Sequence, residues 1–379
     1  MRLPEQVELK KFSIPEFVYG SGASRLCGRY ASKFGVSRVL VVSDPGVSAA
    51  GHAAPVAESL RAEGIAFELF TGISPNPRSA EVRRGVEAYL SAGCDAVVAL
   101  GGGSVMDCAK GIGLSASNRA DVLDFEGIDR VRLPGPPLIC VPTTAGTAAD
   151  VSQFAIINAE ERGTKIAIVS KKAIPDVALI DPELTVTMDG RLTAATGMDV
   201  LSHALEAYAS NAASPVTDLH ALEAIRLTAR YLPAAVAVGS DREARNGMML
   251  ASTFAGFAFS NAGLGAVHAL SHALGGTLDL PHGLCNALLL AVVAEYNEGA
   301  AAARYAEMRA ALAEGYALRG IAVPAEESLG AMLVRLRAEV GLADGLGAYG
   351  VRDRHICDLA RKAYRDACLA TNPRPPTLD

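Results

Sequence analysis

The chain has 379 residues, of which half are hydrophobic and a fifth charged, and its 35 basic and 41 acidic residues give a formal net charge of −6. This length allows two domains that each bury a core, while the lack of a basic tract interleaved with aromatic residues argues against a nucleic-acid partner. No run approaches the roughly 18 apolar residues of a membrane span. The first residues lack the apolar core of a secretion signal, and the seven cysteines are scattered without a paired motif, so we expect a cytoplasmic protein.

The first half of the chain alternates short apolar runs with helical patterns. Runs rich in Val, Ile and Leu, each ended by a turn-forming residue, predict strands at 38–43, 65–70, 95–100, 137–141 and 177–180. Residues 154–158 and 165–169 flank Glu-Glu-Arg-Gly and predict a hairpin. Because helical patterns such as 81–92 separate the strands, we expect a parallel sheet with helices on both faces.

After Asp181 the pattern changes to long segments rich in Ala and Leu. These segments predict helices at 196–210, 215–238, 241–260, 264–275, 283–297, 302–317, 325–340 and 353–369. The predicted organisation is therefore an α/β, Rossmann-like domain with a parallel sheet over residues 1–186, followed by an all-helical domain over residues 187–379.

A run of three glycines follows the predicted strand 95–100 and precedes a helix. Glycines at such a position let the backbone approach a phosphate, and the helix N-terminus favours an anion. Ser104 could cap that helix, with Asp107 three residues further on, as in a purely structural capping box. Since Gly-Gly-Gly-Ser is not the G-x-G-x-x-G fingerprint, the run alone is equally compatible with a tight turn.

Two neighbouring segments support a phosphate-bearing cofactor. Residues 142–147, Pro-Thr-Thr-Ala-Gly-Thr, end the next predicted strand, and ligands of open α/β sheets bind at the carboxyl ends of the strands. Asp44 ends the first of these strands, where a carboxylate could accept hydrogen bonds from an adenosine ribose and would repel a 2′-phosphate. Asp44 could equally do no more than begin the turn with Pro45 and Gly46.

Three of the seven histidines lie within fifteen positions, at His268, His272 and His282. His268 and His272 are four residues apart and would share one face of a helix, while the sequence Pro-His-Gly suits a loop that carries His282. Asp199 and His203 form a second pair with this spacing. Together they predict a site for a divalent cation with nitrogen and oxygen ligands, although a single histidine in an apolar helix is more often a satisfied core residue.

Taken together, these motifs resemble the iron-containing (group III, metal-dependent) alcohol dehydrogenases, over essentially the whole chain. The matching segments are 101–107, 142–147, 193–206, 265–275 and 281–283. The resemblance implies a dehydroquinate synthase-like architecture, in which residues 1–186 bind the dinucleotide and the all-helical domain 187–379 binds the metal and carries out catalysis. It also implies a homodimer or larger homo-oligomer. It also implies metal binding by Asp199, His203, His268 and His282.

The resemblance further implies a hydride transfer between NAD and a primary alcohol or diol, in which the metal polarises the substrate oxygen. Fe²⁺ is the expected metal and Zn²⁺ remains open, because imidazole and carboxylate ligands suit both. His272 would lie beside the substrate without binding metal, and we expect it to relay the proton. The dinucleotide-binding residues implied by the resemblance are Asp44, Asn76, Gly102, Gly103, Ser104, Asp107, Thr143, Thr144, Ser152 and Lys165.

Two other classes of protein remain open at this stage. A metal- and NAD-dependent lyase of the dehydroquinate-synthase kind would bind a phosphorylated polyhydroxy acid, but the segments around His268 and His282 lack the Lys and Arg expected for such a substrate. A non-catalytic protein, in which the metal only stabilises the helical domain, would not explain the glycine- and threonine-rich loops.

Overall fold

The computed structural model describes residues 10–378. The first nine residues, which were part of the prediction that no secretion signal is present, and Asp379 lie outside the described residues. The chain forms two compact units. An α/β unit comprises Pro15–Asp189 and Val238–Met249, and a helical unit comprises residues 10–14, Gly190–Ala237 and residues 250–378. The sequence predicted one border, after residue 186, and the assignment of cofactor binding and catalysis to separate domains stays a prediction.

A parallel sheet forms the centre of the α/β unit. Over residues 10–378 it has six strands in the order β1-β9-β6-β4-β2-β3, and the pairs between them are parallel. The strands are β1 (Glu16–Tyr19), β2 (Arg38–Val42), β3 (Ala66–Phe70), β4 (Ala96–Gly101), β6 (Leu138–Pro142) and β9 (Val177–Ile180). The predicted parallel sheet is therefore confirmed, with β1 added at one edge.

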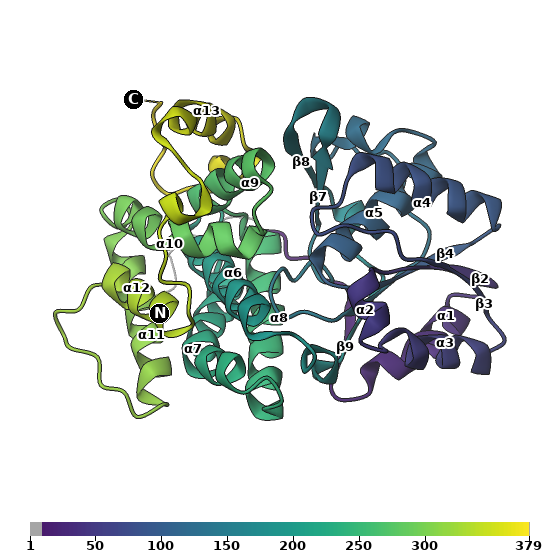
Figure 1. Ribbon diagram of the computed structural model, residues 1–379, viewed down its shortest axis with the longest axis horizontal. Helices are drawn as coiled ribbons and strands as arrows, with labels where there is room; N and C mark the ends of the chain where they lie inside the picture. Colours follow the sequence, from purple (N-terminus) through teal and green to yellow (C-terminus); the bar gives the residue numbers. More distant parts are fainter. Residues whose placement is uncertain (1–9, 379) are drawn as a thin grey trace. The chain divides into compact units, whose positions relative to one another are not determined.

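Helices cover both faces of this sheet, as the near-continuous apolar strands require. Helices α4 (Ser79–Ser91) and α5 (Gly103–Asn118) lie on one face, and α1 (Cys27–Lys33) and α3 (Ala53–Ala62) lie on the other (Figure 1). Successive residues of β2 alternate between two cores: Leu40 packs in one with Ile112, and Val41 packs in the other with Leu60. The alternation follows from the two-residue period of a strand.

The predicted hairpin is also confirmed. Strands β7 (Phe154–Ala159) and β8 (Thr164–Val169) pair antiparallel, and the short β5 (Gly127–Ile128) runs parallel to β8. The turn between β7 and β8 ends at Gly163, whose φ of 57° lies in the left-handed region that favours glycine.

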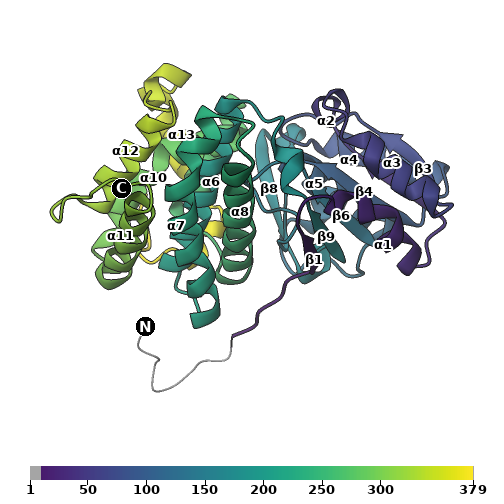
Figure 2. The same ribbon diagram turned by 90° about the horizontal axis from the view of Figure 1, so that it is seen from below.

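The predicted long helices build the second unit, except that α8 begins in the α/β unit, which includes its residues up to Met249. They are α6 (Gly190–Ala209), α7 (Pro215–Ala237), α8 (Arg242–Ala262), α9 (Ala266–Leu278), α10 (His282–Glu298), α11 (Ala302–Ala317), α12 (Leu329–Glu339) and α13 (Asp353–Tyr364). Helices α6 and α7 lie side by side (Figure 2), and they approach closely at Gly197, where a Cβ atom would lie 2.1 Å from Cδ1 of Leu232. Helix α13 ends before the predicted residue 369, and Asp366 begins a separate 3-10 helix, Ala367–Thr371, by accepting a hydrogen bond from the Cys368 amide.

Across residues 10–378, no single helix is both long and apolar enough for a membrane span. Helices α8 and α9 reach the necessary length and apolar character only when the two are counted together, and a sharp bend separates them.

Candidate metal centre and dinucleotide site

Helix α6 supplies the first two side chains of the candidate metal centre. Asp199 and His203 are one turn apart on the same face, and the Nε2 atom of His203 lies 3.8 Å from Oδ1 of Asp199. Both side chains are buried, Asp199 with 1% of its surface exposed. The ring of Phe259 stacks on His203 with 4.3 Å between centroids, which restricts the orientation of the imidazole.

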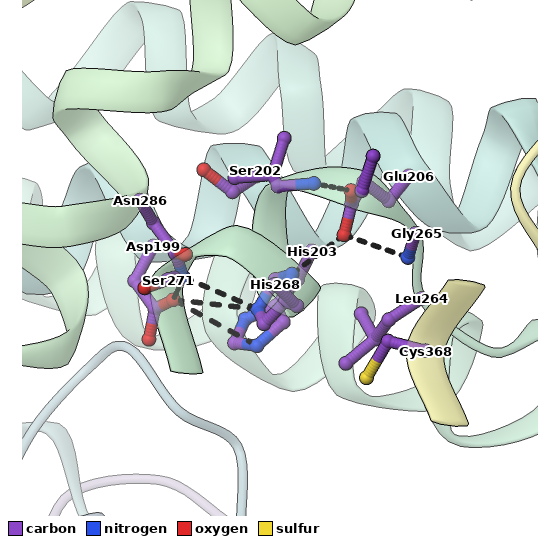
Figure 3. A network of polar contacts seen from close by, with 12 residues as sticks. Asp199, Ser202, His203, Glu206, Leu264, Gly265, His268, Ser271, Asn286 and Cys368 are labelled. Atoms are coloured by element: carbon purple, nitrogen blue, oxygen red, sulfur yellow. Dashed lines mark hydrogen bonds and ion pairs between the residues drawn. The ribbon is translucent and has the colours of Figure 1, made fainter. Parts of the chain in front are cut away.

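Helices α9 and α10 supply the other two side chains. The Nε2 atom of His268 lies 3.8 Å from the same Asp199 oxygen, and that of His282 lies 3.7 Å from it. His282 is the first residue of α10, with Pro281 at the N-cap, so its predicted position in a loop was wrong. The potential ligand atoms of Asp199, His203, His268 and His282 all lie within 4.8 Å of one another, and Figure 3 shows the first three of these side chains converging.

The charges of this cluster suit a cation. Burial raises the pKa of Asp199, while His203 and the amide of Asn286 act in the opposite direction. Burial lowers the pKa of His268 well below its ordinary value, so its imidazole is neutral near pH 7 and keeps a nitrogen lone pair. A buried carboxylate beside a neutral imidazole is costly by itself, and a divalent cation would compensate it.

The amide of Asn286 tests whether the cluster fits a metal. Its Nδ2 atom lies 2.6 Å from Asp199 Oδ1, 3.2 Å from His268 Nε2 and 3.3 Å from His282 Nε2. An amide nitrogen has two hydrogens, so it cannot satisfy three acceptors at once. The Asp199 oxygen and the Nε2 atoms of His268 and His282 are thus directed at one position, and the amide has too few hydrogens to bind all three. Imidazole and carboxylate donors in such an arrangement fit Fe²⁺ or Zn²⁺.

Glu206, one turn beyond His203 on α6, lies behind the candidate ligands. It is buried, and its carboxylate contacts Nδ1 of His268. Burial raises the pKa of Glu206 to about 8, against the backbone hydrogen bonds of Val267 and Gly265, which lower it. A cation on the far side of the His268 ring would favour the ionised carboxylate.

His272 lies next to the four candidate ligands, one turn after His268. Its ring stacks on that of His282, with 5.4 Å between centroids, and its Nδ1 atom lies 2.8 Å from Oδ2 of Asp366. Burial by itself would raise the pKa of Asp366, but His272 and the hydrogen bonds from Cys368 outweigh it, so the pKa is below its ordinary value. Asp366 is therefore an anion that holds one nitrogen of the imidazole.

The predicted dinucleotide residues all belong to the α/β unit, and several come together at one edge of its sheet. Strands β2, β4 and β6 are neighbours, and the segments that follow them carry Asp44, Gly102 and Thr143. The main-chain nitrogen of Thr143 donates to Gly101. A Cβ atom at Gly102 would lie 3.1 Å from Thr144, so the missing side chain lets these two loops touch.

The other predicted residues differ in their surroundings. Lys165 on β8 donates from Nζ to Oδ1 of Asn76 at 2.8 Å. Ser104 does not cap α5: the N-cap is Gly102, and the Ser104 hydroxyl donates to Pro75 O instead, so that prediction was wrong. Asp107 lies half-buried on α5, whereas Ser152 is fully buried.

Asp44 has a structural partner of its own. Its carboxylate accepts a hydrogen bond from the Val47 amide at 2.9 Å and so caps the short helix α2 (Pro45–Ala49). The side chain is only half-buried. A cap uses one carboxylate oxygen, which leaves the other able to accept from a ribose hydroxyl.

Three side chains of the site had no predicted role. Glu206 and Asn286 could have been found, because they lie on the same helical faces as the candidate ligands His203 and His282, at spacings of three and four residues. Asp366 had no such signal, because it meets His272 across 94 positions of sequence.

Comparisons with known proteins match both units. Residues 15–182 match the family described as iron-containing alcohol dehydrogenase, and residues 193–379 match the C-terminal domain of the Fe-containing alcohol dehydrogenase family. The NAD-dependent methanol dehydrogenase of Bacillus methanolicus is 39% identical over 367 residues, which cover 97% of this chain and 96% of that protein. The 1,3-propanediol dehydrogenase of Klebsiella pneumoniae is 40% identical over 358 residues, which cover 94% and 92% of the two chains. A crystal structure of a 1,3-propanediol oxidoreductase superposes with a TM-score of 0.92 at 38% identity, covering 98% of this chain and 97% of that chain.

Proposed function

Because the chain belongs to the iron-containing alcohol dehydrogenase family, we propose that it catalyses the reversible, NAD-dependent oxidation of a primary alcohol or diol to an aldehyde. In this reaction a hydride passes from the alcohol carbon to NAD and one proton is released. The lyase and the non-catalytic metal-stapled protein are not favoured, since the matched relatives are alcohol and diol dehydrogenases.

The observation that carries this proposal is the convergence of three imidazole Nε2 atoms on one oxygen of Asp199. We assign the metal to Asp199, His203, His268 and His282, with Fe²⁺ expected and Zn²⁺ as the other candidate. When bound, the cation would act as a Lewis acid that polarises the substrate oxygen and lowers the cost of removing its proton. The protein's part is to hold these four donors close together, with Asp199, His203 and His268 buried and His282 partly exposed.

We assign the movement of the proton to His272. Asp366 accepts a hydrogen bond from Nδ1 of this ring, so a neutral His272 has its lone pair on Nε2, where it can accept a proton. The charge of Asp366 then stabilises the protonated ring. If His272→Ala kept full turnover and an unchanged pH profile, the proposed relay would be wrong.

We assign the dinucleotide to the carboxyl edge of strands β2, β4 and β6, with the ten residues implied by the family resemblance. A carboxylate at Asp44 favours NAD over NADP, because the 2′-phosphate of NADP would be repelled by it. A cytoplasmic location and assembly into a homodimer or larger homo-oligomer remain predictions.

The experiment is to remove the metal, restore Fe²⁺ or Zn²⁺ separately, and measure NADH formation from a panel of primary alcohols and diols. Activity that depends on metal, and on NAD rather than NADP, would support the proposal and rank both the metals and the substrates. Inactivity across the panel with metal and NAD both bound would contradict this substrate class. Absence of NAD binding would contradict the cofactor assignment.

A further inference from the structure

We propose that Glu206 is a positioning residue of the metal centre, which holds His268 with the Nε2 lone pair directed at the cation and anchors the start of the helix that carries it. This inference rests on the proposed metal site and concerns a residue outside the four ligands. It makes one carboxylate responsible for both the position and the tautomer of a ligand.

The carboxylate reaches His268 from the helix that already provides two ligands. Asp199, His203 and Glu206 are spaced by four and three residues, so they lie on one face of α6. Glu206 is 6% exposed, and its Oε2 atom lies 2.6 Å from Nδ1 of His268. Helix α6 therefore contacts both sides of the His268 ring, with Glu206 at Nδ1 and Asp199 near Nε2.

Glu206 also binds the backbone at the beginning of α9. Oε2 accepts a hydrogen bond from the Gly265 amide at 2.9 Å, and Oε1 accepts one from the Val267 amide at 2.6 Å. The N-cap of α9 is Gly265, which has no side chain to do this. Figure 3 shows the carboxylate directed at Gly265. The first amides of a helix need partners from outside it, and Glu206 supplies them from another helix.

The close approach of Glu206 and Asn372 to the start of α9 leaves no space for a side chain at Gly265. A Cβ atom at Gly265 would lie 2.9 Å from Oε1 of Glu206 and 2.7 Å from Oδ1 of Asn372. Asn372, from the end of the chain, accepts a hydrogen bond from the Ala266 amide at 3.0 Å. Two distant side chains thus cap the same turn of α9, and Glu206 also contacts the imidazole of His268.

The contact determines which nitrogen of His268 carries the hydrogen. A neutral imidazole has one N–H, and the Glu206 oxygen 2.6 Å from Nδ1 is placed to accept it, so the hydrogen resides on Nδ1 and the lone pair on Nε2. The other side of the ring agrees with this assignment, because the Asn286 amide nitrogen lies 3.2 Å from Nε2 and can donate only to a lone pair. Carboxylates that hold metal-binding histidines in this way typically contribute about 10- to 100-fold to metal affinity.

The test compares Glu206→Gln with Asn372→Ala, which removes a cap from the same turn of α9 without touching an imidazole. In Glu206→Gln, the side chain keeps its size, but its amide group opposes one of the N–H donors. The measurements on the otherwise intact protein are Co²⁺ and Zn²⁺ affinity, by competition with a chromogenic chelator, and the Tm with and without metal. The absorption spectrum of bound Co²⁺ reports the ligand geometry.

We expect Glu206→Gln to weaken metal affinity by about 10- to 100-fold, to change the Co²⁺ spectrum and to reduce the rise in Tm on metal binding. Asn372→Ala should lower the Tm of both forms alike and leave the affinity within about threefold, as expected of a helix cap alone. Equal losses of affinity in the two variants, or an unchanged affinity in Glu206→Gln, would overturn the proposal.

Two further outcomes separate this inference from the proposed function. If Glu206→Gln does not fold, Glu206→Asp takes its place. Glu206→Asp keeps the carboxylate but moves it away from His268. A metal affinity no lower than that of Asn372→Ala would again overturn the inference. If the unaltered protein binds no metal, the proposed metal site fails together with this inference. If it binds metal and substitution of Glu206 does not change the metal affinity, the inference alone is refuted.

Discussion

The Nδ1 atom of His272 and the Oδ2 atom of Asp366 lie 2.8 Å apart, although 94 positions separate the two residues in the chain. His272 lies on α9 and Asp366 begins the 3-10 helix near the end of the chain. A carboxylate at this distance sets the tautomer of the ring and stabilises its protonated form. We therefore expect Asp366 to assist the proton transfer proposed for His272.

Replacing Asp366 by Asn should separate orientation from charge. The Asn oxygen can still accept from Nδ1, but the protonated ring loses its negative neighbour. We expect kcat to fall by about 10- to 100-fold with metal and NAD affinity unchanged. Cys357→Ala, at an exposed position of α13, is the control and should keep kcat. Full turnover in Asp366→Asn would show that the carboxylate has only a structural role.

A methyl group at Gly283 should disturb the metal centre through packing alone. A Cβ atom there would lie 2.4 Å from the main-chain oxygen of Ala195, so the first turn of α10, with His282, must move away from α6. We expect Gly283→Ala to lower the free energy of unfolding by about 1–3 kcal/mol and to weaken metal binding. Urea unfolding of the metal-free protein and chelator competition measure the two effects.

The control for this substitution is Gly299→Ala, at the other end of the same helix. Among residues 10–378, no atom outside its two chain neighbours lies within 4 Å of a Cβ built there, and the φ of −61° suits any residue. Stability and metal affinity should both stay near those of the unaltered protein. A Gly283→Ala protein that behaves like this control would contradict the close approach of α10 to α6.

Substitution at Asp44 tests the choice of dinucleotide. Asp44→Ser keeps an oxygen that can cap α2 through the Val47 amide but removes the charge. We expect the ratio of kcat/KM for NADP to that for NAD to rise by at least about tenfold, which corresponds to roughly 1.4 kcal/mol. An unchanged ratio in a protein of normal stability would mean that Asp44 only caps α2 and does not select the dinucleotide.

The pH dependence of stability should reveal the carboxylate of Asp95. It accepts hydrogen bonds from the amide and hydroxyl of Ser37 and from the amide of Arg38. Burial raises its pKa, but these bonds outweigh burial, so the pKa is lower in the folded than in the unfolded protein. The folded state then gains stability at pH values above the unfolded pKa of about 3.9, and loses this gain as the pH falls through the folded pKa.

We therefore expect Asp95→Asn to cost about 1 kcal/mol in the free energy of unfolding at pH 7, a small value because the side chain is exposed. The difference from the unaltered protein should narrow below about pH 4. Urea unfolding of both metal-free proteins, down to the lowest pH at which they stay folded, measures this. A difference that is constant with pH would show that the charge of Asp95 contributes nothing.

Local pattern was sufficient for most of the fold. Apolar runs of four to six residues such as β2 and β9 predicted the parallel sheet, because strands buried on both faces need no polar alternation. The i, i+4 spacing of Asp199 and His203 predicted one half of the metal cluster, because one helical turn places such side chains together. These features depend on neighbours in the chain, so the sequence by itself determined them.

The tertiary structure decided which of these local faces meet. Glu206 joins His268 across 62 positions and Asp366 joins His272 across 94, and neither distance corresponds to any period of a helix or strand. Likewise, Ser104 binds Pro75 O instead of capping α5, because a neighbouring loop offers an acceptor that no local pattern could indicate. Hydrogen-bond partners contributed by distant segments depend on how the helices pack, and side-chain packing between elements has no signature in the spacing of residues along one chain.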